Sequence, residues 1–197
     1  MKINQHNFPS KLTLSLLLVA LLSGCAAAVV GTGIAVGAMV ATDRRTSGAQ
    51  LEDETIELKS SNAIKGALGD KAHVNITSYN RRVLLTGEAS STNDKVFIEK
   101  TVMKVENVQS IVNDIAIMPT SDLTRRSEDA VITGKIKASL LEMHGLQANV
   151  VKVVTERGVV YLLGKVTPAE LENATKVARG VSGVLKVVRV AEVVPAK

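Results

Sequence analysis

The hydrophobic positions between residues 51 and 195 follow the same pattern twice. In each copy, aliphatic residues first recur at helical spacing, and two short stretches of alternating apolar and polar residues come next. A second stretch with helical spacing and a last alternating stretch complete the copy. The pattern therefore predicts two successive units, each with the order helix, strand, strand, helix, strand.

The two copies correspond most closely at their paired strands, where they share an offset of 77 residues. At this offset, residues 74–77 and 82–87 of the first copy match residues 151–154 and 159–164 of the second. For the first helices we expect an offset of 72, which pairs Ile64 and Leu68 with Ile136 and Leu140. The difference predicts about five additional residues in the second copy, in the region 143–147.

Each unit is expected to be a small α+β sandwich, in which two amphipathic helices cover one face of a three-stranded sheet. We place the two units in tandem, at residues 51–119 and 125–195. Ser91 and Thr167 are the expected starts of the second helices, because Ser and Thr side chains cap helices and a proline follows Thr167. With two Tyr, two Phe and no Trp, aliphatic residues must fill both cores.

The first 24 residues carry the pattern of a bacterial export signal. A polar stretch with two lysines precedes an apolar run at residues 12–22, which is too short to span a bilayer alone. The sequence Leu-Ser-Gly-Cys then ends at Cys25 and resembles the lipobox of bacterial lipoproteins. This resemblance implies cleavage before Cys25, a diacylglycerol on its sulfur and an acyl chain on its new amino group. Ala26 is similar to the pattern that sorts lipoproteins to the outer membrane.

Apolar residues continue after the cysteine, and residues 25–50 are rich in Ala and Gly. We expect this segment to be the linker between the lipidated cysteine and the first unit. Because no charged residue lies between Leu12 and Ala41, a signal anchor that is never cleaved is the alternative. An intact Met1 in the mature protein would identify that alternative.

The charge of the chain is divided unevenly between the two units. Residues 51–124 contain 8 Lys and Arg against 11 Asp and Glu, whereas residues 125–197 contain 12 against 7. A basic half on a membrane-tethered protein favours contact with anionic lipid, and a solvated charged surface is the alternative. Nucleic acid is not an expected partner, because the chain offers few aromatic side chains for stacking and is exported.

The chain lacks the residue clusters that enzymes and metal sites need. Cys25 is the single cysteine, and the three histidines, His6, His73 and His144, are far apart in the sequence and are expected on the surface. No nucleophile motif or phosphate-binding loop is present. The sequence therefore predicts no catalytic residue, no metal site and no cofactor.

Several repeated motifs resemble the BON domain, a small bacterial module. The second strands end in Val-X-Leu-X-Gly, at residues 83–87 and 160–164, where we expect the glycine to be a backbone requirement. The first copy also has the Val-Asn pair of the family at residues 112–113, whereas the second copy has Val-Arg at 188–189. Residues 41–48 are similar to the linker of outer-membrane lipoproteins that carry two such domains.

The resemblance to these lipoproteins implies a periplasm-facing protein, held at the outer membrane by lipid. It further implies binding to anionic phospholipid and support of outer-membrane integrity, often at division sites. A periplasmic scaffold that docks envelope proteins or cell wall, without selecting lipids, is the alternative function.

The first helix of the second unit is the candidate lipid-binding element. It combines basic residues with aliphatic residues that its own core does not need, as helices lying on anionic membranes do. The candidate residues are Arg125, Arg126, Val131, Ile132, Lys135, Lys137 and Leu141. The alternative is that these aliphatic residues face the other domain.

Overall fold

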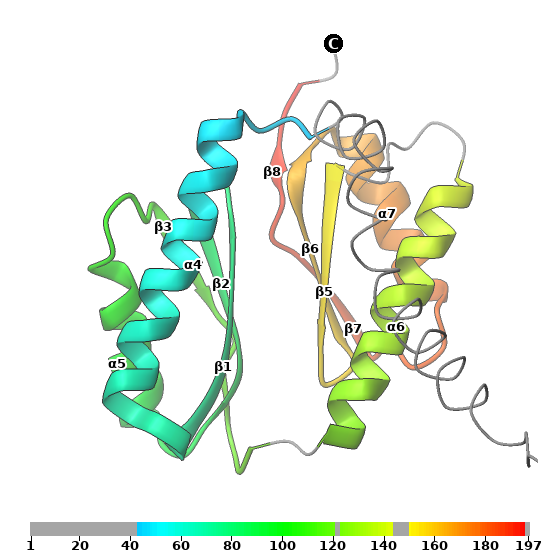
Figure 1. Cartoon of the computed structure of the whole chain (residues 1–197). Helices are drawn as coiled ribbons and strands as arrows, with labels where there is room; N and C mark the ends of the chain where they lie inside the picture. Colours follow the sequence, from blue (N-terminus) through cyan, green and yellow to red (C-terminus); the bar gives the residue numbers. More distant parts are fainter. Residues whose placement is uncertain (1–42, 121–122, 144–149, 196–197) are drawn as a thin grey trace, which may run out of the picture. The chain divides into compact units, whose positions relative to one another are not determined.

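A computed structural model describes residues 43–120, 123–143 and 150–195 of the chain. The predicted signal, Cys25 and most of the Ala/Gly-rich linker lie outside these ranges. One compact unit spans Thr42–Lys197 and contains both predicted repeats (Figure 1). Within the described ranges, no helix is long and apolar enough to cross a membrane.

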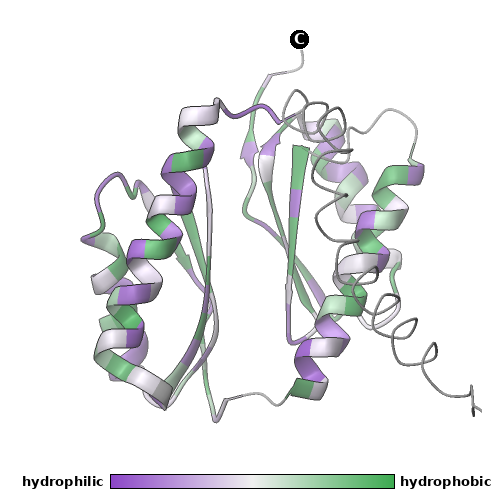
Figure 2. Cartoon of the chain, in the orientation of Figure 1, coloured by the Kyte–Doolittle hydropathy of each residue, from purple (hydrophilic) through white to green (hydrophobic). Residues whose placement is uncertain are grey.

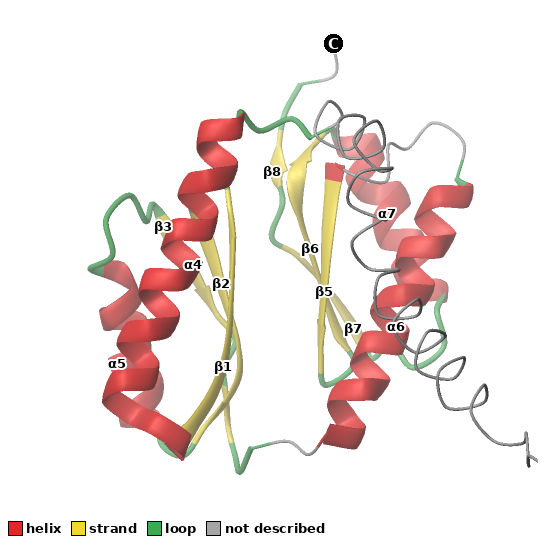
Figure 3. Ribbon diagram, in the orientation of Figure 1, coloured by secondary structure: helices red, strands yellow, loops and turns green. Residues whose placement is uncertain are grey.

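Both repeats have the predicted order of elements (Figure 3). The first repeat consists of α4 (Ser47–Leu68), the short 3-10 helix η1 (Gly69–Lys71), β1 (Ala72–Tyr79), β2 (Arg82–Ala89), α5 (Thr92–Met103), β3 (Ser110–Asn113) and β4 (Ala116–Ile117). The second consists of α6 (Leu123–Glu142), β5 (Val151–Glu156), β6 (Val159–Val166), α7 (Pro168–Gly180), β7 (Lys186–Arg189) and β8 (Glu192–Val193). The predicted α+β fold class is confirmed.

The sheets of the two repeats have the same topology. In the first, the strand order is β1-β2-β3, with β1 antiparallel and β3 parallel to β2, and β4 pairs with β2 beyond β3. In the second, the order is β5-β6-β7, and β8 pairs with β6. Each sheet therefore has three principal strands, as predicted, and the short β4 or β8 continues the last one.

Side-chain caps fix the starts of the helices. The hydroxyl of Ser91 accepts a hydrogen bond from the Asp94 backbone N–H, as predicted for the start of α5. Thr167 and Glu170 form a reciprocal capping box at α7, with Pro168 in the first turn. Thr46 caps α4 in the same manner by accepting from the Ala49 N–H. The first helix therefore begins at Ser47, before residue 51, where the first unit was predicted to start.

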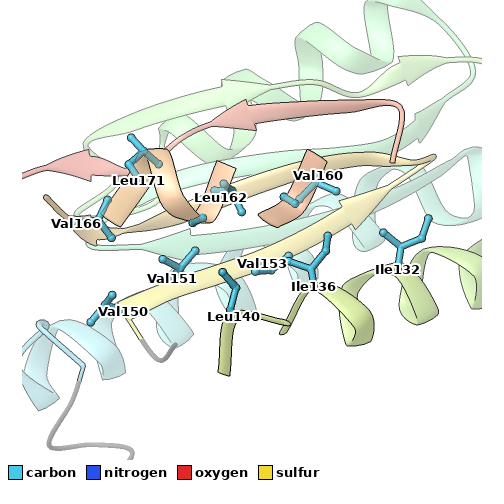
Figure 4. Close-up of a cluster of buried hydrophobic side chains, with 12 residues drawn as sticks. Ile132, Ile136, Leu140, Val150, Val151, Val153, Val160, Leu162, Val166 and Leu171 are labelled. Carbon is cyan, nitrogen blue, oxygen red and sulfur yellow. The ribbon is translucent and has the colours of Figure 1, made fainter. Parts of the chain in front are cut away.

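Each repeat has its core between its helices and one face of its sheet. Along β2, Val83 and Leu85 point into the first core. In the second core, α6 packs its aliphatic residues against β5 and β6 (Figure 4). Both α4 and α6 carry apolar and polar residues along their whole length (Figure 2), as a helix with one buried face does.

The buried positions of α4 and α6 correct the predicted alignment of the first helices. They match at an offset of 76, not 72: Asp53, Ile56, Ser60 and Ile64 correspond to Asp129, Ile132, Ile136 and Leu140. The error was four residues, about one helical turn, because aliphatic residues recur at that spacing along one helix face. The second copy therefore has one additional residue between helix and strands, and not five.

Glycine is required at the end of both central strands. Gly87 and Gly164 have φ values of 103° and 156°. A Cβ atom would lie 2.0 Å from the carbonyl oxygen of His73 at the first position, and 2.2 Å from that of Val150 at the second. The predicted backbone requirement is therefore confirmed. It arises from the positive φ and also from close contact with the backbone of an adjacent segment.

The sheet faces that carry no helix contact each other. A third apolar cluster joins Tyr79 and Leu84 of the first repeat to Tyr161, Leu163 and Val190 of the second. Polar contacts surround this cluster: the Tyr161 hydroxyl lies 2.6 Å from Asp114 Oδ2, Asn75 donates to Glu156, and the Arg157 guanidinium donates to the Gly87 carbonyl at 2.9 Å. The two repeats therefore meet through their sheets and not through α6.

His73 lies at this contact and not on the open surface that the sequence suggested. Its side chain is 26% exposed, and its Nδ1 atom lies 3.3 Å from Oε2 of the fully buried Glu88. The Arg157 guanidinium approaches Glu88 from the other repeat. The other two histidines, His6 and His144, lie outside the described residues.

Candidate functional site

A groove of about 560 Å³ lies beside the N-terminal half of α6. Its walls are α6, the turn between β5 and β6, and the loop between α7 and β7. The α6 wall includes Thr124, Arg125, Glu128, Val131, Ile132 and Lys135, and the two loops contribute Gly158, Gly183 and Leu185. The groove therefore lies at the end of the second sheet where its first two strands turn.

Exposed aliphatic side chains and cationic side chains meet at this groove. Val131 is 55% exposed and Leu185 is 81% exposed, although both are aliphatic. Ile132 is only 8% exposed and belongs to the core, so it forms the floor of the groove. Arg125 and Lys135 lie on the exposed side of α6 at either end of this apolar surface.

A buried carboxylate holds the groove's turn against α6. Asp129 accepts hydrogen bonds from the backbone N–H groups of Arg157 at 2.7 Å and Gly158 at 2.8 Å. Both turn residues have positive φ, of 51° and 71°, as tight hairpin turns require. The same device exists in the first repeat, where Asp53 accepts from the corresponding turn at Asn80 and Arg81.

At the corresponding end of the first repeat, a side-chain hydrogen bond joins the two walls. Asn107 donates from Nδ2 to Glu52 Oε1 at 2.8 Å, which joins the loop after α5 to α4. In the second repeat the residue at the position of Asn107 is Gly183, whereas the glutamate is retained as Glu128. The groove therefore lies where the second repeat has glycine in place of this side chain.

The structure separates the predicted lipid-binding residues into two flanks of α6. Arg125, Val131 and Lys135 line the groove, with Ile132 as its floor. The remaining three, Arg126, Lys137 and Leu141, lie on the opposite side of the helix, roughly 180° from the mean direction of the groove residues at 100° per residue. Leu141 is 71% exposed, so neither it nor Val131 packs on the other domain. Three further residues of the groove were not predicted from the sequence, namely Gly158, Gly183 and Leu185.

The segment before α4 lies at the other end of the second sheet. Arg44 forms a bidentate pair with Glu170, at 2.7 Å and 2.8 Å, and donates to the Lys165 carbonyl at 2.9 Å. The hydrogen bond from Arg44, together with the backbone N–H and the hydroxyl of Thr167, lowers the pKa of the Glu170 carboxyl to about 2. Lys165 lies near the end of β6, whereas the groove lies where β6 begins.

The next residue, Arg45, attaches the same segment to the first repeat. Its guanidinium lies 2.7 Å from Asp53 Oδ2 and 2.8 Å from Asp43 Oδ2, and stacks 4.1 Å from the centre of the Tyr79 ring. Burial raises the pKa of the Tyr79 hydroxyl to about 12, and the negative charge of Asp43 adds to the effect. The segment that leads to the predicted lipid anchor therefore binds both repeats.

Nothing in the described part of the chain resembles a metal centre, since no three His, Cys, Asp or Glu residues converge there. The sequence profile of the BON domain family matches residues 52–119 and 128–195. The chain belongs to the BON domain family. The motifs at the ends of the central strands therefore identified the family correctly.

Two relatives are similar over most of the chain. The outer membrane lipoprotein DolP of Haemophilus influenzae is 40% identical over 171 residues, which cover 86% of this chain and 88% of the relative. The 21 kDa hemolysin of Actinobacillus pleuropneumoniae is 37% identical over 150 residues, covering 75% of this chain and 77% of the relative. The osmotically-inducible protein Y of Escherichia coli is 41% identical over 61 residues, or 30% of each chain. The resemblance to lipoproteins with two BON domains is thus confirmed.

Proposed function

We propose that the protein is an outer-membrane lipoprotein, acylated at Cys25 and facing the periplasm, whose second BON domain binds anionic phospholipid through its groove. Its similarity to DolP, an outer membrane lipoprotein, supports the location, and the lipobox pattern supports the acylation. Binding of lipid by the groove would support the integrity of the envelope, including at division sites. The protein acts in this proposal as a binding module and not as an enzyme.

The difference between the two repeats carries the proposal. At the offset of 76, the second repeat has Val131, Leu185 and Arg125 where the first has Thr55, Gln109 and Ala49. All three changes add aliphatic surface or positive charge around the same groove. Aliphatic side chains that enter the interface, with cations beside them, are the combination that anionic membranes bind.

The expected affinity suits a protein that is already anchored. Transfer of Val131 and Leu185 into the headgroup region contributes about 1–2 kcal/mol each, because both are only partly buried in the free protein. Arg125 and Lys135 add about 1 kcal/mol each near an anionic surface. The sum of a few kcal/mol corresponds to weak, reversible binding by the groove alone. Acylation at Cys25 supplies the stable attachment.

Vesicle binding by the non-acylated protein, residues 26–197, tests the proposal. The protein should sediment with vesicles that contain phosphatidylglycerol and much less with vesicles of phosphatidylcholine alone. Val131→Glu and Leu185→Glu should each weaken binding about tenfold or more. The matched variants Thr55→Glu and Gln109→Glu make the same change at the corresponding positions of the first repeat and should bind normally.

Two outcomes would contradict the proposal. Binding that is independent of phosphatidylglycerol content would contradict the specificity for anionic lipid. Equal losses of binding in the matched variants of the two repeats would contradict binding at the groove. Leu141→Glu and Lys137→Glu compare the other flank of α6 with the groove, and we expect smaller losses from them. The mass of the mature N-terminus tests acylation at Cys25 separately.

A further inference from the structure

The first repeat has an open sheet edge at β1. The strand order makes β1 an outer strand, bonded to β2 on one side. Its hairpin joins Tyr79 to Arg82 through two residues with positive φ, Asn80 and Arg81, so Tyr79 and Arg82 form the closing hydrogen-bonded pair of a two-residue turn. The N–H and C=O groups of every second residue before Tyr79 then also bond to β2. Those of Val74, Ile76 and Ser78 point to the free edge.

One end of this edge is occupied by side chains, and the other end is not. The outward N–H of Ser78 donates to Glu57 Oε1 at 2.7 Å, and Lys152 of the second repeat binds the same carboxylate at 3.1 Å. This contact confirms which residues point outward. Beside Val74 and Ile76, in contrast, an opening of about 210 Å³ lies between β1 and the C-terminal half of α4.

The opening has an apolar floor and one basic wall. Its residues are Ser61, Ile64 and Lys65 of α4, Gly69 after the helix, and Ala72, His73, Val74 and Ile76 of β1. Ile64 is buried, and the side chains of Val74 and Ile76 are half-buried against the core. Lys65 is exposed on α4, and Lys71 lies just before the strand. A strand added to β1 would place alternate side chains over this floor.

The strand of the second repeat that corresponds to β1 is more deeply buried. Val151 and Val153, which match Val74 and Ile76, are 5% and 4% exposed. On the helix, Ile136 is fully buried at the position of Ser60. The smaller serine leaves β1 less covered by its own helix. Val74 and Ile76 are therefore less covered than their counterparts in the second repeat.

We propose that β1 binds an extended peptide segment of another protein, which adds a strand to the first sheet beside Val74 and Ile76. Main-chain hydrogen bonds to the outward N–H and C=O groups of these two residues supply affinity that does not depend on the peptide sequence. Aliphatic side chains at alternate positions of the peptide fill the opening beside Ile64. An acidic group of the peptide pairs with Lys65, which complements the charge of the basic wall.

Synthetic nine-residue peptides test this proposal with the full-length protein in detergent micelles. The panel has Val or Ile at alternate positions, Thr between them and Glu placed at either end, and binding is followed by fluorescence anisotropy and by amide hydrogen exchange. A binding peptide should slow exchange of the Val74 and Ile76 amides at least tenfold. Methylation of the peptide's alternate backbone nitrogens should weaken binding at least tenfold, because it removes its donors.

Two protein variants separate the edge from the helix. Val74→Pro removes one outward N–H without breaking the ladder to β2, since proline is tolerated on edge strands, and Ser61→Trp fills the opening from an exposed position of α4. Each should weaken binding at least tenfold, whereas Ala63→Trp, exposed on another side of α4, should not. If Val74→Pro fails to fold, the comparison of Ser61→Trp with Ala63→Trp still tests whether the peptide binds in the opening.

The proposal is overturned if no peptide of the panel slows exchange at Val74 and Ile76, or if Ser61→Trp binds as well as Ala63→Trp. Slowed exchange that depends on protein concentration without peptide would identify a second copy of the chain as the occupant, and would also overturn it. Val131→Glu should bind peptide normally. Failure at the lipid groove and failure at this edge are therefore distinguishable.

Discussion

The two BON domains share a scaffold but differ at the end of the sheet where the first two strands turn. In the first repeat, Asn107 bridges that end by donating a hydrogen bond to Glu52. In the second, Gly183 leaves the same place open, and Val131 and Leu185 stand exposed beside it. The two domains thus have the same fold, but this end is a polar contact in the first and an apolar groove in the second.

The residues that hold the scaffold together did not change with that end. Asp53 and Asp129 cap their turns in the same manner, and the glycines at the ends of the central strands meet equivalent carbonyl groups. Scaffold positions and groove positions can therefore be told apart by comparing the two copies within one chain. The first group should respond equally to mutation in both repeats, and the second should not.

The largest effect is expected from replacing either strand-end glycine with alanine. Gly87→Ala and Gly164→Ala each force a Cβ atom against a backbone carbonyl that lies 2.0 Å or 2.2 Å from its place. Neither neighbour is a flexible side chain, so each change should destabilise its repeat by roughly 3 kcal/mol or more. Amide exchange of Leu85 and Leu162 reports the two cores separately. If only one of the two variants lost protection from exchange in its own repeat, the two scaffolds would not be equivalent.

Closing the groove is expected to have the next largest effect. Gly183→Asn restores the side chain of the first repeat opposite Glu128, and Asn tolerates positive φ. The new Cβ would lie 3.0 Å from the Cδ1 methyl of Ile132, which must shift slightly. We expect binding to phosphatidylglycerol vesicles to fall about tenfold, or about 1.4 kcal/mol, with little loss of stability.

The reverse change, Asn107→Gly, is the control for that experiment. It should open the first repeat without creating lipid binding, because Thr55 and Gln109 supply no aliphatic surface there. Lipid binding gained by Asn107→Gly would show that an open end alone is sufficient. Unchanged binding in Gly183→Asn would show that the opening is not what the lipid occupies.

The sequence predicted those features that depend on local pattern. Alternating and helical periodicity identified all the principal elements, and the Ser and Thr caps marked the second helices. Gly87 and Gly164 were recognisable because glycine ends the same strand twice. Each of these signals lies within a few residues of the feature that it predicts, and the duplication strengthened them.

Features that depend on contacts between distant segments could not be predicted from local sequence pattern. The first helices were misaligned by one turn, and their register follows from the buried positions, among them Asp53 and Asp129, which bond to their turns. Leu185 reaches the groove from the loop after α7, which is adjacent to α6 only in the folded chain. With the offset of 76, the change from Gln109 to Leu185 would have been a usable signal.

The attachment of the linker to the second repeat should depend on pH. Because the pKa of Glu170 is lowered from 4.5 to about 2, its pair with Arg44 stabilises the protein above pH 4.5 and is lost as the pH falls toward 2. Glu170→Gln keeps the capping box but removes the charge. We expect it to cost about 1 kcal/mol at pH 7. Urea unfolding of both proteins should show this difference shrinking as the pH falls from 4.5 toward 2, and a constant difference would contradict the assignment.

The smallest expected effect concerns Ser60, which stands where the second repeat has Ile136. Its hydroxyl is fully buried and has no hydrogen-bond partner among the described residues. Removing a buried hydroxyl of this kind, and gaining alanine's higher helix propensity, should make Ser60→Ala more stable by about 0.5–1 kcal/mol. Thermal unfolding measures the gain. Ile136→Ala, which instead leaves a cavity in the second core, should lower the free energy of unfolding by about 2–4 kcal/mol. A destabilised Ser60→Ala would contradict the prediction, because it would show that the serine hydroxyl has a hydrogen-bond partner outside α4 and its core.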